Sequence, residues 1–201
     1  MKKTVNINVE GDMLDQLKDS GYKLCIAMKV ENYDYNVAWY STEKYLEINS
    51  FSWVPQYEVF ATNSFLSNTK VGASCTPVRL DFGEITTFSR TGRMSPPVTG
   101  GAGDALNIKN EFGLIRFGIN QLCTGVDGSR QSSAIFVTPS GILSGEISFK
   151  PSEKIQVWFE QSMESSTILT VMRSNCMELD MANSDSRSVL FNKSGSWVIT
   201  A

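Results

Sequence analysis

Histidine is absent from this chain of 201 residues. Its absence excludes Ser-His-Asp and Cys-His nucleophilic catalysis, imidazole metal sites and the side chain used most often for proton transfer near neutral pH. Chemistry would have to rest on carboxylates, lysine, tyrosine, cysteine or an organic cofactor. The sequence therefore favours a protein that is not an enzyme, and no cofactor or metal site is expected.

Positive charge is also scarce. Lysine and arginine number 18 against 21 aspartate and glutamate, which gives a formal net charge of −3. Such a chain has no cationic surplus to neutralise a phosphate backbone, so nucleic acid is not an expected partner. The chain also lacks a run of ~18 consecutive apolar residues, the length that a membrane-spanning helix needs.

Cysteine is sparse and widely spaced. The four cysteines, Cys25, Cys75, Cys123 and Cys176, contain no CxxC pair, which excludes the short-loop zinc and thioredoxin patterns. A chain of this length can build a core without disulfides, so we expect mostly buried free thiols. The first residues, MKKTVNINVEGD, lack the apolar core and cleavage site of a secretory signal. A cytoplasmic location, or release without a classical signal peptide, is expected.

Alternation of apolar and polar residues is the main positive signal. Val5, Ile7 and Val9 alternate with polar residues, as in a half-buried strand, and similar runs recur from Gly21 onward. The exception is a segment near residues 12–20, where the leucines have helical spacing, Asp12 can cap and Gly21 can end the helix. The sequence therefore predicts an all-β protein, an antiparallel β-sandwich with at most this one short helix.

Two prolines interrupt strong β-forming runs. FSWVPQYEVF (51–60) and ISFKPSEKIQVWF (147–159) share a β-run, a proline and a second β-run, about 96 residues apart. Proline has no N–H for a sheet ladder, so Pro55 and Pro151 are each predicted to lie between two strands, at a turn or at an edge where the missing N–H costs nothing. The echo indicates an internal duplication, although β-proteins repeat strand–turn–strand patterns in any case.

A segment rich in proline and glycine separates the two similar parts. SRTGRMSPPVTGGAGD contains two prolines and four glycines and is predicted to be a linker loop over 89–104. It divides an N-terminal β half, 1–88, from a C-terminal β half, 105–201, which pack as one sandwich or as two small domains. TGGAGD lacks the lysine and flanking helix of a phosphate-binding loop, so its functional alternative is a mobile loop that orders over a ligand.

Carboxylate pairs are the remaining motif that suggests catalysis, because glycoside hydrolysis needs only two carboxylates. The pairs are Glu160 with Glu164, Glu178 with Asp180, and Asp81 with Glu84. With 21 acidic residues such pairs arise by chance, so we assign none of them a catalytic role. DMANSD (180–185) has hard oxygen ligands for calcium, but it lacks the glycine and terminal glutamate of an EF-hand and is interpreted as a polar turn.

Aromatic residues supply the candidate binding site. ENYDYNVAWY (31–40) lies in a hairpin predicted over 22–41, with Tyr33 at its tip. Sugar sites combine flat aromatic rings with polar groups, and peripheral membrane binders use tyrosine and tryptophan at the interface. The candidate ligand-binding residues are Tyr33, Asp34, Tyr35, Asn36 and Tyr40. Tyr35 and Trp39 share one face of the predicted strand, so if that face is core, Tyr40 on the other face is expected to be exposed. The four tryptophans, Trp39, Trp53, Trp158 and Trp197, are interpreted as core residues.

These features lead to three functional hypotheses. The first is a non-catalytic recognition protein, lectin-like or membrane-targeting in the manner of a soluble toxin, whose partner is a glycan or a membrane surface. The second is a small β-fold enzyme or cyclase-like protein that binds an apolar substrate between its sheets and uses carboxylate or tyrosine groups as acid and base. The third is a structural protein that forms homo-oligomers through exposed strand edges.

Overall fold

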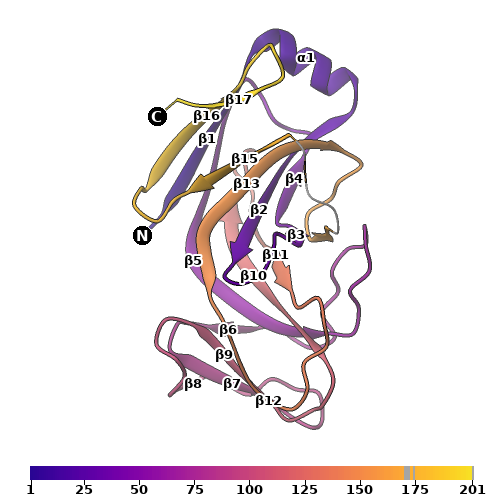
Figure 1. Ribbon diagram of the computed structural model, residues 1–201, viewed down its shortest axis with the longest axis vertical. Coiled ribbons are helices and arrows are strands. Elements are labelled where there is room, and N and C mark those ends of the chain that lie inside the picture. Colours follow the sequence, from indigo (N-terminus) through magenta and orange to yellow (C-terminus); the bar gives the residue numbers. More distant parts are fainter. Residues whose placement is uncertain (170–172, 174, 201) are drawn as a thin grey trace.

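The computed structural model describes residues 1–169, 173 and 175–200, and its regular secondary structure is almost all β-strand (Figure 1). The largest sheet has the order β11-β10-β5-β1-β16-β17, with β6 also paired to β5. Its strands are β1 (Lys3–Val9), β5 (Ile48–Thr62), β6 (Val78–Leu80), β10 (Arg116–Thr124), β11 (Arg130–Val137), β16 (Ser186–Phe191) and β17 (Trp197–Ile199).

Three smaller sheets contain the other strands of the described residues. The second sheet has the order β15-β13-β2-β4 and consists of β2 (Tyr22–Val30), β4 (Tyr40–Thr42), β13 (Pro151–Gln161) and β15 (Cys176–Asp180). The third has the order β12-β9-β7-β8 and consists of β7 (Glu84–Phe88), β8 (Val98–Thr99), β9 (Leu106–Asn110) and β12 (Gly145–Phe149). The last pairs β3 (Val37–Ala38) with β14 (Thr167–Ile168).

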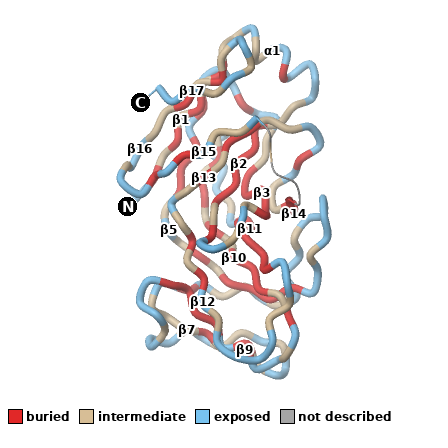
Figure 2. The backbone as a smooth tube through the Cα atoms, in the orientation of Figure 1, coloured by how far each residue is buried: buried red, intermediate tan, exposed pale blue. Residues whose placement is uncertain are grey.

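The predicted fold class, an all-β antiparallel sandwich, is confirmed. Buried apolar residues of the first and second sheets belong to one core cluster. Along the tube in Figure 2, buried residues gather on the strands and exposed residues gather in the connecting loops. Most strand pairs are antiparallel, and the exceptions among the described residues are β1 with β16 and β7 with β9, which are parallel.

The short helix near residues 12–20 is confirmed as α1 (Gly11–Asp19). Its N-cap residue is Glu10 rather than the predicted Asp12, which lies in the first turn, where its charge stabilises the positive end of the helix dipole. Leu17 is buried against the sheets, and Gly21, at φ 72°, turns the chain into β2. Within the described ranges no helix is long and apolar enough to cross a bilayer.

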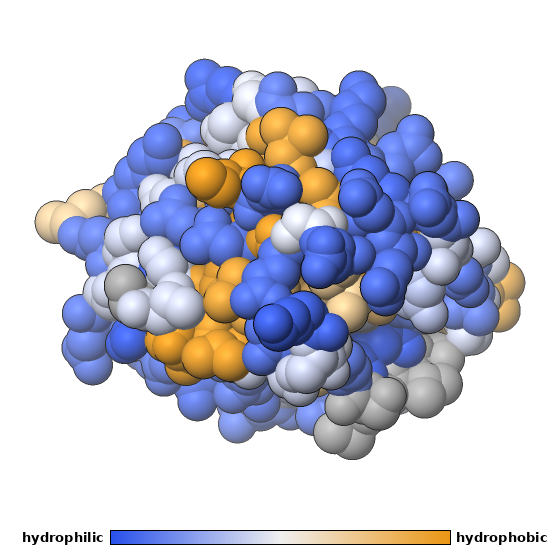
Figure 3. Space-filling model, turned by 90° about the horizontal axis from the view of Figure 1, so that it is seen from above, coloured by the Kyte–Doolittle hydropathy of each residue, from blue (hydrophilic) through white to orange (hydrophobic). Residues whose placement is uncertain are grey.

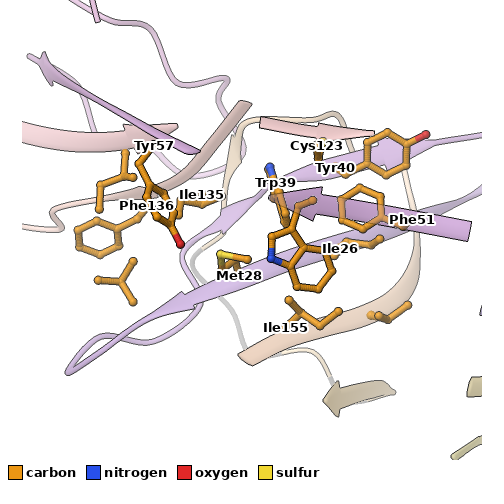
Figure 4. Close-up of a cluster of buried hydrophobic side chains, with 14 of the residues drawn as sticks. Ile26, Met28, Trp39, Tyr40, Phe51, Tyr57, Cys123, Ile135, Phe136 and Ile155 are labelled. Atoms are coloured by element: carbon orange, nitrogen blue, oxygen red, sulfur yellow. The ribbon is translucent and has the colours of Figure 1, made fainter. Parts of the chain in front are cut away.

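Aromatic rings fill the space between the sheets, as Figure 4 shows. Trp39 is fully buried, its ring meets Phe51 edge-on at 5.0 Å between centroids, and its Nε1 donates a hydrogen bond to the carbonyl of Gln121 at 3.2 Å. Each such buried side chain contributes about 1.5–3 kcal/mol to folding. The interpretation of the tryptophans as core residues is confirmed for Trp39, Trp53 and Trp158, which are buried, while Trp197 is half-buried against the main core.

The prediction that Pro55 ends a strand is wrong, because β5 is one strand of 15 residues that continues through it. On one side, β5 pairs with β1 as far as Trp53 and with β6 from Tyr57 onward. On the other side, the register with β10 shifts between Gln121 and Cys123. Pro55 therefore lies at a bulge between two partner strands, where a missing N–H breaks no ladder hydrogen bond.

Pro151 behaves as predicted, since it begins β13 and a single residue, Lys150, separates it from β12. The two strands belong to different sheets, so the chain changes sheet at this proline. The two prolines that looked alike in the sequence therefore have different structural roles. The internal duplication stays a prediction.

The segment 89–104 folds as part of the third sheet. It contains β8, which pairs with β7, and its ends lead to β7 and β9, which are parallel neighbours. Strands from both sides of the segment mix in the first and second sheets. The proposed division into an N-terminal and a C-terminal half stays a prediction, and strands of both halves pair with each other in these sheets.

Candidate functional site

The loop after β2 carries most of the candidate residues, and Asn36 holds its far end. The Asn36 amide donates to the carbonyl of Val137 at 2.7 Å and accepts from the Val137 N–H at 3.4 Å. The carbonyl of Asn36 accepts from the Leu169 N–H at 2.8 Å. At the near end, the Glu31 N–H donates to the carbonyl of Lys150 at 2.9 Å. The loop is thus fixed between β11, β12 and the segment after β14.

A cavity of about 470 Å³ opens beside this loop. Four of the five candidate residues line it: Tyr33, Asp34, Tyr35 and Asn36. Asn32, from the same loop, also lines it, and the remaining lining residues come from distant parts of the chain and are Phe65, Pro139, Gln156, Leu169 and Arg173. The volume lies in the range of ~300–1,000 Å³ that is usual for small-molecule sites.

Both tyrosine rings of the loop have fixed orientations. The Tyr33 ring packs against Phe136, with centroids 4.6 Å apart and planes inclined by 53°. The Tyr35 hydroxyl donates to a carboxylate oxygen of Glu178 at 3.1 Å, and the ammonium group of Lys29 lies 5.7 Å from the centre of the Tyr35 ring. The rings are therefore held in place without a ligand, which lowers the entropy cost of binding one.

Electrostatics make Tyr35 a hydrogen-bond donor rather than a base. Burial first, and then the negative charge of Glu178, raise the pKa of the Tyr35 hydroxyl far above its ordinary value of 10.0. The hydroxyl therefore stays protonated near neutral pH, and its proton is directed at Glu178. A general base near neutral pH needs a pKa close to the working pH, so Tyr35 does not fit that role.

Tyr40, the fifth candidate, lies elsewhere, and the expectation that it faces solvent is wrong. Its side chain is buried, its ring lies 5.1 Å from that of Phe51, and its hydroxyl accepts a hydrogen bond from the Val126 N–H at 3.2 Å. Because Trp39 and Tyr40 alternate along the strand, one face was expected to be exposed to solvent. Both residues are buried, so both faces of this short stretch are covered by other parts of the protein. The ring of Tyr40 also occupies the space beside Gly125, where a Cβ would come within 2.6 Å of its hydroxyl.

Sequence reasoning missed the other half of the cavity. Phe65 lies in the loop after β5, and Pro139 follows β11, and neither belongs to a distinctive motif. Gln156 belongs to the polar, outward set of β13, and its amide donates to the sulfur of Cys176 at 2.9 Å. No local pattern marks these residues, because only the sheet topology brings them together.

A second cavity, of about 570 Å³, lies between α1 and the end of β13. Its charged centre is Glu160, whose carboxylate accepts a hydrogen bond from Trp158 Nε1 at 2.8 Å and forms an ion pair with Arg173, with Nε 2.7 Å away. The Arg173 guanidinium also lies 5.7 Å from the centre of the Trp158 ring. Arg173 lines both cavities, so the two sites share this side chain.

The carboxylates of the sequence motifs are engaged in structural contacts. Glu178 bonds to Tyr35, and Asp180 lies 3.8 Å from Lys154. Asp185, part of the candidate calcium sequence, forms an ion pair with Lys3 at 3.3 Å. Among the residues that the structure describes, no three His, Cys, Asp or Glu side chains gather as a metal site would need. These contacts support structural roles for the acidic residues.

Comparisons of the chain with protein-family models, with curated proteins and with solved structures found no significant match. The functional argument therefore depends on the geometry of the site.

Proposed function

We propose that this protein is a non-catalytic recognition protein and that it binds a sugar or a similar polar ring in the cavity beside Tyr33 and Tyr35. The observation that carries the proposal is the convergence of Tyr33, Asp34, Tyr35 and Asn36 on one cavity of about 470 Å³. We further propose, as part of this function, a cytoplasmic location or release without a classical signal peptide.

The chemistry of the lining supports a glycan. Sugar rings present an apolar face to aromatic rings and hydroxyl groups to polar side chains. The cavity offers the rings of Tyr33 and Tyr35 together with the exposed polar side chains of Asn32 and Asp34. Phe65, half-buried, adds a third aromatic ring from a distant segment. A carboxylate at the rim can accept two hydrogen bonds from neighbouring hydroxyl groups.

The packing of the interior favours recognition over the enzyme hypothesis. An enzyme acting on an apolar substrate between the sheets needs space there, and Trp39, Phe51 and Trp53 fill that region with mutual ring distances of 5.0 to 6.0 Å. The cavity beside Tyr35 lies instead on the outer face of the second sheet, lined by Gln156. Its tyrosine is held protonated and suits binding rather than proton transfer.

A glycan array with purified protein tests the proposal. We expect selective retention of one glycan class, weakened at least about tenfold by Asp34→Ala, because a hydrogen bond to a charged group contributes about 1.5–3 kcal/mol. Tyr33→Leu keeps apolar packing against Phe136 but removes the flat ring, and it should weaken binding to a similar extent. Asp15→Ala is the matched control, since this exposed carboxylate lies on α1.

Two results would refute the proposed site. One is an array on which no glycan is retained by folded protein. The other is an array on which the Asp34→Ala and Tyr33→Leu variants bind the glycan as strongly as the Asp15→Ala control does. Circular dichroism and thermal unfolding of each variant separate loss of the site from loss of the fold.

A further inference from the structure

Three loops meet at the end of the third sheet, and each exposes large apolar or basic side chains. The loops are 89–93, 111–115 and 141–144, and together we call them the three-loop tip. The third sheet lies at the end of the molecule opposite α1 (Figure 1). Phe112, Leu114 and Leu143 are 46%, 68% and 70% exposed. Side chains of this kind at neighbouring loops form an apolar surface patch rather than scattered exceptions.

The backbone brings the two leucines side by side. Ile115 and Ile142 form an antiparallel bridge, with N–H to carbonyl distances of 3.1 and 2.6 Å. In such a bridge the flanking residues, Leu114 and Leu143, lie opposite each other and point to the same face. Leu114 also lies close over Gly141, where a Cβ would come within 2.7 Å of its Cδ1.

Phe112 extends this patch toward the first loop. Its ring lies 5.3 Å from that of Phe88, and its edge would be 3.7 Å from a Cβ placed at Gly92. Gly92 belongs to the turn that carries Arg90 and Arg93, both exposed. An apolar ring and two guanidinium groups therefore adjoin each other at the tip.

A buried asparagine holds the apolar loops in position. Asn110 is 1% exposed, and its amide nitrogen lies within hydrogen-bond distance of the carbonyls of Gly113, Ile142 and Leu143, at 2.7, 3.1 and 3.1 Å. Its carbonyl oxygen accepts from the Phe112 N–H at 3.0 Å. The exposed leucines are thus presented by a braced scaffold.

The tip is cationic although the chain is anionic. Its three loops carry two basic side chains, Arg90 and Arg93, and one acidic side chain, Glu111. Lys109 and Glu111 form an ion pair at 2.8 Å, which leaves the two arginines of the turn as the exposed charges beside Phe112. The formal net charge of the whole chain is −3, so the tip is opposite in sign to the chain as a whole.

We propose that the three-loop tip docks on an anionic lipid bilayer, with Leu114, Leu143 and Phe112 entering the interface and Arg90 and Arg93 resting on the headgroups. Apolar insertion and attraction of arginine to anionic lipid act together in this kind of binding. The proposal concerns a surface separate from the glycan cavity, and neither depends on the other.

The opposite end of the molecule supplies a matched comparison. Leu46 and Ile48 are 62% and 79% exposed, but the exposed residues beside them in the chain are Glu43, Lys44 and Glu47. Viewed from this end, in Figure 3, the hydrophobic side chains are broken up by hydrophilic ones. This end has comparable apolar exposure without a cationic excess, so it should not bind anionic lipid.

Vesicle flotation tests the proposal with the full chain. Wild-type protein should float with vesicles of phosphatidylcholine containing roughly 30% phosphatidylserine, and less with pure phosphatidylcholine or at high salt. The double variant Leu114→Ser with Leu143→Ser should bind at least about tenfold more weakly. The double variant Arg90→Ser with Arg93→Ser should bind anionic vesicles at least about tenfold more weakly and should lose the preference for phosphatidylserine. Leu46→Ser with Ile48→Ser should bind like the wild type.

Three outcomes would overturn the proposal. The first is wild-type protein that does not float with anionic vesicles. The second is an equal loss of flotation in the Leu46→Ser, Ile48→Ser control. The third is a dimer in size-exclusion chromatography that the Leu114→Ser, Leu143→Ser variant converts to monomer without any vesicle binding, because the tip would then be a self-association surface. All substituted side chains are exposed, so the variants should unfold at the wild-type temperature.

Discussion

The ring of Phe60 occupies the space over Gly118 on the neighbouring strand, so that a Cβ at Gly118 would overlap the Cζ atom of the ring. The two residues are direct partners of β5 and β10, and Phe60 is 1% exposed. A glycine opposite an aromatic residue lets the ring lie flat across the strand pair. Because the ring is packed on its other sides by Val37, Ala134 and Val137, it has little freedom to move away.

Gly118→Ala should therefore destabilise the protein. The added methyl group forces Phe60 out of its position, and overpacking of this kind costs about 1–3 kcal/mol. The free energy of unfolding in urea measures the loss. Gly72→Ala is the matched control, because its Cβ would meet no atom within 4 Å, and its stability should stay within about 0.5 kcal/mol of the wild type. Equal stability of the two variants would contradict the prediction.

Asn107 should be as important for the 99–104 segment as Asn110 is for the tip. Its amide lies 2.9 to 3.1 Å from the carbonyls of Glu84, Ala102 and Ala105, and its side chain fills the space where a Cβ of Gly101 would lie. Asn107→Ala should cost about 2–3 kcal/mol, because it removes several hydrogen bonds that each contribute about 0.5–1.5 kcal/mol.

Limited proteolysis gives a second measurement for Asn107. The Asn107→Ala variant should be cut faster within residues 99–104 than the wild type, since the loop loses its hydrogen bonds. Asn6→Ala serves as the control, because Asn6 makes only exposed or part-buried contacts at 3.4 and 3.5 Å. Unchanged cutting in the Asn107→Ala variant would show that the backbone alone orders this loop.

The thiols should react in two classes. Burial first of all raises the pKa of Cys25 and of Cys123 from the ordinary 9.0 to about 12, and both side chains are buried. Cys75 and Cys176 are half-buried. In native protein at pH 8, a thiol reagent should modify Cys75 and Cys176 well before the other two, and denaturant should release all four. Equal rates in native protein would contradict this assignment.

The same two thiols predict a loss of stability in alkali. Their pKa is higher in the folded state than in the unfolded chain, so the stabilisation is complete below pH 9 and declines as the pH rises from about 9 toward about 12. Urea unfolding at pH 8 and at pH 10 should show the decline. The double variant Cys25→Ala with Cys123→Ala should lose less stability between pH 8 and pH 10 than the single variant Cys75→Ser does.

Local periodicity was enough to predict the fold class. The alternation around Val5, Ile7 and Val9 gives β1, whose burial pattern alternates along its whole length. The helix α1 stands out because its leucine spacing changes from two to three. Pro55 could not be interpreted in this way, because a bulge depends on where two partner strands end, and those partners are distant in sequence.

The candidate site could be predicted only in part, because a local pattern identifies only residues that are close together in the sequence. Tyr33 to Asn36 form one continuous segment, so a local pattern could identify them. Phe65, Pro139 and Arg173 reach the cavity only through the arrangement of the sheets. Tyr40 was misplaced because strand alternation assumes one solvent face, and this short stretch is covered on both.

The parallel pairing of β1 with β16 also has a consequence for how the chain folds. Val5 and Ile7 are partners of Arg187 and Val189, so the centre of the largest sheet joins residues from near the two ends of the described chain. Contacts of such long sequence separation slow folding, since their loop-closure entropy is lost before the pairing stabilises anything. Until β16 arrives, one edge of β1 has no partner in the sheet and can template pairing with another chain. Aggregation during refolding should therefore decrease when refolding is carried out at low protein concentration.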